Sequence, residues 1–216
     1  MMDNIKSLSF RQLYQQLIYI EDEKLLNIMK MGYQIPSLFD ESGILAYGYV
    51  DEEQGICFNI FSLVKMKDGE LVEFNDEPMK KKLKHRLKYD DLKNSSVMSI
   101  DLDPDIAMGY VDRAKEINKE LNVSPSRLEL RANSQIDPFR HNIHPDDFEC
   151  FLYDPKTNAS ISFWLRGEKL TKDSIIGNIL TPLPREYGFA IGDMIEIKFY
   201  NYKGAIRPIH VIENVQ

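Results

Sequence analysis

The sequence has little cysteine and no long apolar run, and both absences restrict what the protein is. Only Cys57 and Cys150 occur among its 216 residues, which excludes a disulfide scaffold and a zinc site made of cysteine alone. No stretch of about 18 apolar residues is present, so no membrane-spanning helix is predicted. The polar N-terminus does not have the pattern of a secretory signal. We therefore expect a cytoplasmic protein with reduced thiols and no membrane partner.

Several common catalytic motifs are also absent. The sequence has no Walker A loop, no G-x-G-x-x-G, no G-x-S-x-G and no H-E-x-x-H. These absences disfavour nucleotide-dependent enzymes and the common hydrolase classes, and we expect no cofactor. Alanine is scarce whereas isoleucine and lysine are plentiful. This bias indicates an AT-rich genome, and hence a bacterial or phage origin for an acidic protein whose net charge is −7.

The first half of the chain predicts helices followed by a β-meander. Apolar residues at helical spacing predict a helix over 10–31, with a break near residue 20. Apolar and aromatic runs predict strands at 43–50 and 56–64. Asp68-Gly69 is typical of a tight hairpin turn, and a strand follows it at 71–74. The region 44–74 therefore predicts three antiparallel strands.

Two more helices are predicted before residue 122. Pro78 is suited to the first position of a helix over 78–93. A short strand follows at 97–101. Asp103 is then an N-cap candidate and Pro104 a first helical residue, which together predict a helix over 104–121.

The second half is predicted to be mainly β. Its expected order is strand, strand, strand, helix, strand, strand, which is the element order of an OB-like five-stranded barrel. The fold class is therefore α+β, with a boundary near 122–126 that divides 1–122 from 123–216, either as two domains or as one packed core. The expected strands are 127–131, 148–153, 161–166, 194–200 and 206–212, with a short helix over 171–180.

One loop combines residue types that bind metals. His141, His144 and Asp146 lie close together in the sequence, with Asp147 directly after them. Imidazoles and carboxylates are ligands for transition metals, and histidine is a common catalytic base. The spacing does not match a helical zinc signature. The alternative is a solvated loop of turn-forming residues, so no metal site is assigned and the three residues stay weak catalytic and metal candidates.

A basic stripe interrupts the acidic chain. Residues 78–93 contain seven basic and two acidic residues, a net charge of +5. Such a stripe is suited to a phosphate backbone or to an acidic protein partner. The alternative is a surface helix whose lysines balance the acidic remainder of the chain. The candidate partner-binding residues are Lys80, Lys81, Lys84, Arg86 and Lys88.

Aromatic residues are frequent in the predicted strands of the second half. Phe163 and Trp164 are adjacent, so a strand directs them to opposite faces. One of the two is expected in the core. The other is either an ordinary surface residue or one that stacks on a base or anchors a partner protein. Trp164 is therefore a further partner-binding candidate.

These observations favour a non-enzymatic protein that binds another macromolecule through protein contacts. Two alternatives stay open. One is a metal-assisted hydrolase or nuclease that uses His141, His144 and Asp146. The other is a nucleic-acid-binding OB-like module. The sequence does not specify the partner or the oligomeric state.

Overall fold

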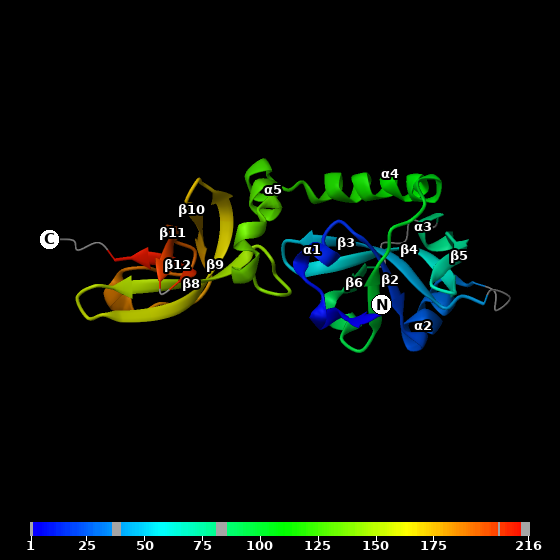
Figure 1. The fold of residues 1–216 in the computed structure, drawn as a ribbon, viewed down its shortest axis with the longest axis horizontal. Helices are drawn as coiled ribbons and strands as arrows, with labels where there is room; N and C mark the ends of the chain where they lie inside the picture. The colour runs from blue at the N-terminus through cyan, green and yellow to red at the C-terminus, as the bar shows by residue number, and fades with distance from the viewer. Residues whose placement is uncertain (1, 36–39, 81–85, 203, 213–216) are drawn as a thin grey trace. The chain divides into compact units, whose positions relative to one another are not determined.

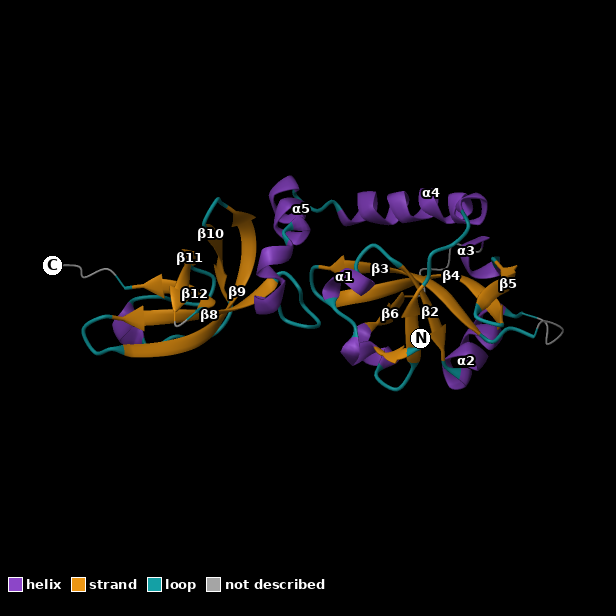
Figure 2. Cartoon of the chain, in the orientation of Figure 1, coloured by secondary structure: helices purple, strands orange, loops and turns teal. Residues whose placement is uncertain are grey.

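The computed structural model describes residues 2–35, 40–80, 86–202 and 204–212. The chain divides into two compact units, Met1–Asn122 and Val123–Gln216. Figure 1 shows that each unit is built around its own sheet, and Figure 2 shows the mixture of helices and strands. The α+β class is confirmed, including the mainly β second half.

The first unit contains a strongly curled antiparallel sheet with the order β1-β7-β2-β3-β4-β5, and β6 pairs with a second stretch of β4. Its long central strands are β3 (Gly43–Asp51) and β4 (Gly55–Lys67), and this central position explains why most residues of the two strands are buried. The turn at Asp68-Gly69 joins β4 to β5 as expected, with both residues at positive φ. The remaining strands are β1 (Asp3–Asn4), β2 (Leu17–Glu21), β5 (Glu70–Asn75), β6 (Arg86–Lys88) and β7 (Ser96–Ser99).

Helix α4 (Pro104–Leu121) runs across one face of this sheet (Figure 1). Asp103 caps it by accepting a hydrogen bond from the Asp105 N–H at 2.9 Å, so the predicted helix over 104–121 is confirmed. Tyr110 of the helix stacks on Phe61 of β4 with ring centroids 5.6 Å apart, and Phe61 stacks on Tyr47 of β3. These three stacked aromatic rings therefore pack the helix against the sheet.

The other helices of this unit are short. They are η1 (Ile5–Ser7), α1 (Phe10–Leu13), α2 (Glu23–Tyr33), α3 (Glu77–Lys80) and η2 (Tyr89–Leu92). The prediction of a helix over 10–31 is correct for 10–13 and 23–31 and wrong for the middle, because 17–21 form strand β2. Ile18, Tyr19 and Ile20 are all buried, as expected for a strand covered on both faces.

The prediction of a helix over 78–93 is wrong over 86–93, and its part over 81–85 lies outside the described residues. Glu77–Lys80 is α-helical, whereas Arg86–Lys88 pairs with β4 as strand β6. Leu87 is buried against the sheet while the residues on either side of it are exposed. Leu87, one of the three apolar positions of the predicted helix, thus belongs to a strand.

The second unit contains a closed five-stranded barrel in which neighbours follow the order β10-β11-β12-β8-β9. Each strand pairs with the next along the chain, and a parallel pairing of β12 with β8 closes the barrel. The five-stranded barrel is confirmed, but its strand order is that of a meander and differs from the Greek-key order of an OB-fold. The strands are β8 (Asp147–Asp154), β9 (Ala159–Leu170), β10 (Ser174–Ile179), β11 (Met194–Tyr202) and β12 (Ala205–Val211).

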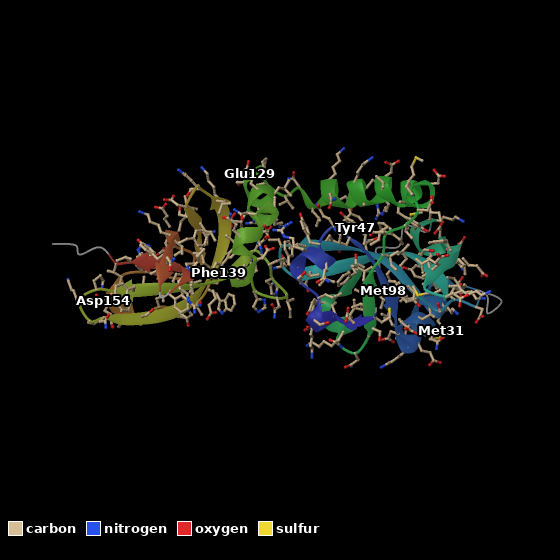
Figure 3. All side chains as sticks on the ribbon, in the orientation of Figure 1. Met31, Tyr47, Met98, Glu129, Phe139 and Asp154 are labelled. Carbon is tan, nitrogen blue, oxygen red and sulfur yellow. The ribbon has the colours of Figure 1, made fainter. Side chains whose placement is uncertain are left out.

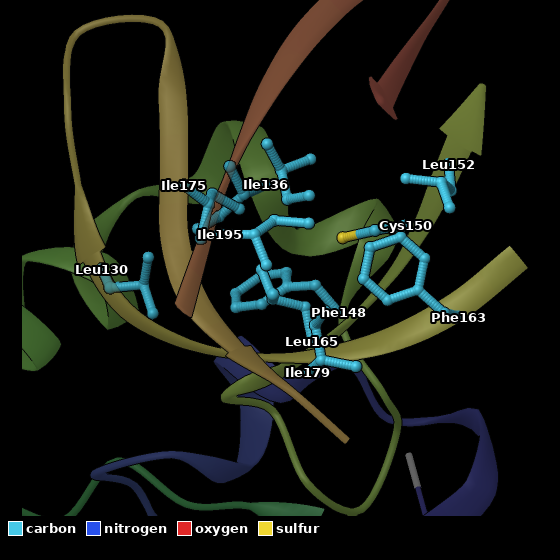
Figure 4. Close-up of a cluster of buried hydrophobic side chains, with 11 residues drawn as sticks. Leu130, Ile136, Phe148, Cys150, Leu152, Phe163, Leu165, Ile175, Ile179 and Ile195 are labelled. Carbon is cyan, nitrogen blue, oxygen red and sulfur yellow. The ribbon is translucent and has the colours of Figure 1, made fainter. Parts of the chain in front are cut away.

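Alternating side chains fill the barrel with a compact apolar core (Figure 4). Phe148, Cys150 and Phe163 are buried there, together with Leu165 and Ile175. Gly167 and Gly177 allow close packing, since a Cβ on Gly177 would lie 2.1 Å from the Arg166 carbonyl oxygen. The interior is therefore a filled core.

Two local predictions in this unit are wrong. Residues 127–131 form part of helix α5 (Pro125–Ala132), and 174–179 form strand β10 where a short helix was expected. Two 3-10 helices complete the unit, η3 (Ser134–Phe139) and η4 (Arg185–Tyr187). No helix among the described residues has the length and apolar character needed to cross a bilayer.

Candidate functional site

The loop that precedes β8 is a tightly hydrogen-bonded turn. Nδ1 of His141 accepts hydrogen bonds from the backbone N–H groups of Ile143 at 3.2 Å and His144 at 3.1 Å. The His141 N–H donates to the Asp147 carbonyl oxygen at 2.8 Å. Burial lowers the pKa of His141, and the neighbouring His144 lowers it further. His141 therefore acts as a neutral acceptor that closes this turn.

Asp146 and Asp147 of this loop are each paired with an arginine. Asp146 receives three hydrogen bonds from the buried guanidinium of Arg131, and the shortest is 2.6 Å. Asp147 is paired with Arg166 at 2.8 and 3.2 Å. Across the described ranges, no group of three or more histidine, cysteine, aspartate or glutamate residues is placed to hold a metal. The geometry thus supports a structural role for Asp146.

The described candidates of the basic stripe lie in two elements, helix α3 and strand β6. Lys80 lies 3.7 Å from Glu77, and Arg86 donates a 2.8 Å hydrogen bond to Asp51. Lys88 lies with Arg86 on the exposed side of β6. The remaining candidates of the stripe, Lys81 and Lys84, lie outside the described residues.

Trp164 lies on the outer surface of the barrel, whereas its neighbour Phe163 is 2% exposed in the core. The expected alternation is therefore confirmed. Trp164 is half-buried and meets the edge of His141 with ring centroids 5.0 Å apart. The turn around His141 thus supports one side of the indole ring.

The pairing register places further aromatic residues on this outer surface. Trp164 lies opposite Glu149, and Phe151 lies opposite Ser162. Phe151 and Trp164 are therefore diagonal neighbours on one surface, a separation that large side chains can bridge. Tyr153 extends the same row along β8, and both Phe151 and Tyr153 are half-buried.

Barrel closure brings the last hairpin to the same surface. Ile209 of β12 lies opposite Phe151, and the Arg207 guanidinium is 6.0 Å from the centroid of the Phe151 ring. Tyr200 of β11 lies opposite Arg207 and is 40% exposed. The barrel aromatic face is defined here as Glu149, Phe151, Tyr153, Trp164, Lys198, Tyr200, Arg207 and Ile209.

The charged members of the barrel aromatic face are available to a ligand. Lys198, Arg207 and Glu149 are exposed. None of the three forms an ion pair with another described residue. The face therefore combines an apolar centre with two cations and one anion, none of which is ion-paired with a described residue.

Sequence reasoning identified Trp164 but missed Arg207. Arg207 is an isolated basic residue in a predicted strand, and its significance comes from the aromatic ring that lies beneath it. The available signal was the β period of 2, which assigns Arg207 and Ile209 to one side of their strand. The β period does not predict which strand pairs with theirs, so the contact between Arg207 and Phe151 could not be predicted.

Comparisons with family models, with curated proteins and with solved structures found no match to this chain. The geometry described above is therefore the basis for a functional assignment. The barrel aromatic face combines outward-facing aromatic rings, of which Tyr200 is 40% exposed, with charged side chains that form no ion pair with a described residue.

Proposed function

We propose that this chain is a non-enzymatic binding protein that contacts a partner protein through the barrel aromatic face. The observation that carries the proposal is the convergence of Trp164, Phe151, Tyr200 and Arg207 from four strands onto one outer surface. Tryptophan, tyrosine and arginine are the residues that most often dominate the energy of protein interfaces. A rigid barrel presents them with little loss of side-chain entropy.

The charge of the face favours protein over nucleic acid as the partner. Lys198 and Arg207 are accompanied by the exposed carboxylate of Glu149, so the surface lacks the uniform positive charge that a phosphate backbone requires. Arg207 lies over an aromatic ring, which leaves its outer edge free to donate to a carboxylate. The matching partner surface carries an acidic side chain beside an exposed apolar group.

The aromatic side chains supply the expected binding energy. Truncating an anchoring tryptophan or tyrosine at an interface typically costs more than about 2 kcal/mol, a loss of at least about thirtyfold in affinity. We expect the double substitution Trp164→Ala with Tyr200→Ala to abolish recovery of the partner. Both side chains lie outside the barrel core, so the fold should persist.

The test is affinity capture from a low-GC bacterial lysate at low and high salt, with and without nuclease. Wild-type protein is compared with the double variant and with Met194→Ala. Met194 is a suitable control because it is 66% exposed on β11, six residues from Tyr200. The proposal predicts a protein that survives nuclease and high salt, persists with Met194→Ala and disappears with the double variant.

Two outcomes would reject this assignment. Retention that vanishes with nuclease would identify nucleic acid as the partner. Equal recovery by wild type and the double variant would show that binding does not use the barrel aromatic face. Circular dichroism of each variant verifies that the barrel is intact.

A further inference from the structure

A cleft in the first unit lies between α4 and the sheet, separate from the barrel aromatic face. Its volume is about 430 Å³, within the range of small-molecule sites. Figure 3 labels Tyr47, which lies on β3 beside α4 and forms part of the wall. The apolar wall is made of Leu17, Tyr47, Ile100, Leu102, Ala107, Tyr110, Val111 and Ala114.

The polar rim of this cleft is positioned by an unusual backbone. Gln15 has a φ of 58°, a left-handed conformation that is strained for a glutamine. Its N–H donates to the Gly48 carbonyl oxygen at 2.8 Å, and the Gly48 N–H donates to the Gln16 carbonyl oxygen at 3.0 Å. A Cβ on Gly48 would lie 2.0 Å from the Leu13 carbonyl oxygen. The chain therefore uses glycine to hold Gln15 and Gln16 against the mouth of the cleft.

Two polar side chains inside the cleft leave hydrogen-bonding capacity unused. Nδ2 of Asn118 donates to the Tyr47 hydroxyl oxygen at 2.9 Å. Tyr47 is 5% exposed, and burial raises its pKa, so the hydroxyl keeps its proton at neutral pH. Within the described part of the chain, that proton has no acceptor and Oδ1 of Asn118 has no donor. A donor and an acceptor therefore stand side by side.

Gln16 adds a second polar pair. Its side-chain amide has no hydrogen-bond partner among the residues that the structure describes, although the residue is half-buried and lines the cleft. The mouth also carries Asp101 and Lys115, and Lys115 is paired with Asp112 at 3.0 Å. The cleft thus offers amide and hydroxyl groups, and its lining cation, Lys115, already has a carboxylate partner.

Other residues of α4 line a second cleft, whose polar groups differ from those of the first. It is larger, about 670 Å³, but its charged groups are engaged with one another. Arg86 is paired with Asp51 at 2.8 Å, and Arg113 lies 3.9 Å from Glu120. Its polar groups are therefore less available to a ligand than those of Asn118, Tyr47 and Gln16.

We propose that the cleft lined by Tyr47, Asn118 and Gln16 binds an uncharged planar heterocycle of the nucleobase class. Such a ring presents a donor beside an acceptor along one edge, which complements the Asn118 carbonyl and the Tyr47 hydroxyl. Asparagine and glutamine side chains are well matched to such edges. The apolar wall, including Leu17 and Val111, would contact the faces of the ring. Lys115 is paired with Asp112 and Asp101 is acidic, so the mouth favours a nucleoside over a phosphorylated nucleotide.

The test is titration of the full chain with adenosine, guanosine, cytidine and uridine, and with the 5′-monophosphate of each. Binding is measured by calorimetry and by amide chemical shifts. We expect saturable binding of at least one nucleoside at submillimolar concentration, with shifts at Gln16 and Asn118. Asn118→Leu should weaken binding at least about tenfold, because it removes the acceptor and leaves the Tyr47 hydroxyl without its amide donor. Ala114→Phe should abolish binding by filling the cleft.

The matched control is Lys119→Ala, which alters the exposed residue next to Asn118 and does not line the cleft. It should bind as the wild type does. If Ala114→Phe fails to fold, the comparison of Asn118→Leu with Lys119→Ala still decides the question. The proposal is overturned if no nucleoside binds saturably, if Asn118→Leu binds as tightly as Lys119→Ala, or if a nucleotide binds more tightly than its nucleoside.

Discussion

Arg131 and Asp146 form an ion pair in the interior of the second unit, and its removal provides a quantitative test of the fold. The side chains are 2% and 8% exposed, with N···O distances of 2.6, 2.9 and 3.2 Å. Asp146→Asn keeps the size of the side chain and removes its charge. The variant loses the carboxylate that accepts three hydrogen bonds from the buried Arg131 guanidinium, so we expect a loss of about 3–5 kcal/mol in unfolding free energy.

Replacing both partners gives the opposite expectation. Arg131→Met combined with Asp146→Leu removes the desolvation penalty together with the attraction. Buried ion pairs replaced by apolar residues of similar volume are often neutral or stabilising. The double variant should therefore lie much closer to wild type than Asp146→Asn alone. This non-additivity distinguishes an ion pair from two independent contacts.

Trp164 is the only tryptophan in the chain and lies on β9, so its fluorescence reports on this unit. Urea unfolding followed at this residue separates the barrel from the first unit, which a global signal would not do. Asp173→Asn is the control, because Asp173 is an exposed acid of the same unit and should change stability by less than about 0.5 kcal/mol. A loss below about 1 kcal/mol for Asp146→Asn would refute the argument.

Three further predictions address other regions. Gly48→Ala should destabilise the first unit by about 1–3 kcal/mol, because the new Cβ would lie 2.0 Å from the Leu13 carbonyl oxygen. Urea unfolding followed by circular dichroism measures this loss. Burial lowers the pKa of His141, so the unfolded chain binds a proton at this residue more readily than the folded chain does. The free energy of unfolding should therefore fall as the pH drops below about 6.5. His141→Gln should make the free energy of unfolding less dependent on pH between pH 7 and 5. Burial raises the pKa of Cys57 to about 11 and also raises the pKa of Cys150. At pH 8 a thiol reagent should therefore label both cysteines only after unfolding. Fast labelling of the native protein would contradict the buried placement of the two thiols.

Some elements were predictable because their signals are local. Helix α4 begins and ends where Asp103, Pro104 and Asn122 predict, since capping and a left-handed C-cap depend only on neighbouring residues. The same kind of signal was overlooked at α5. Ser124 accepts a hydrogen bond from the Arg127 N–H at 3.3 Å, and Pro125 is the first helical residue. Two alternating leucines were a weaker indication than this cap.

Other elements depend on contacts that no short window contains. Leu17 and Ile20 fit a helical period, yet their segment lies in a sheet whose neighbouring strands bury it. The apolar run 17–20 was equally consistent with a buried strand, and the helical spacing did not decide between them. The candidate surface has the same limitation. Trp164 was found by alternation, whereas Arg207 reaches Phe151 only because the first and last strands of the barrel pair.

That pairing also sets the order in which the chain can fold. The contacts between β8 and β12 join residues near 151 to residues near 209, so the second unit has contacts of high sequence separation and is expected to fold more slowly than a local helical unit. During synthesis, Met1–Asn122 emerges first and contains its own sheet. The barrel has to wait for Ala205–Val211 to leave the ribosome before it closes. Until then the surface that carries Trp164 lacks Arg207 and Ile209, so partner binding through it would report that translation of the barrel is complete.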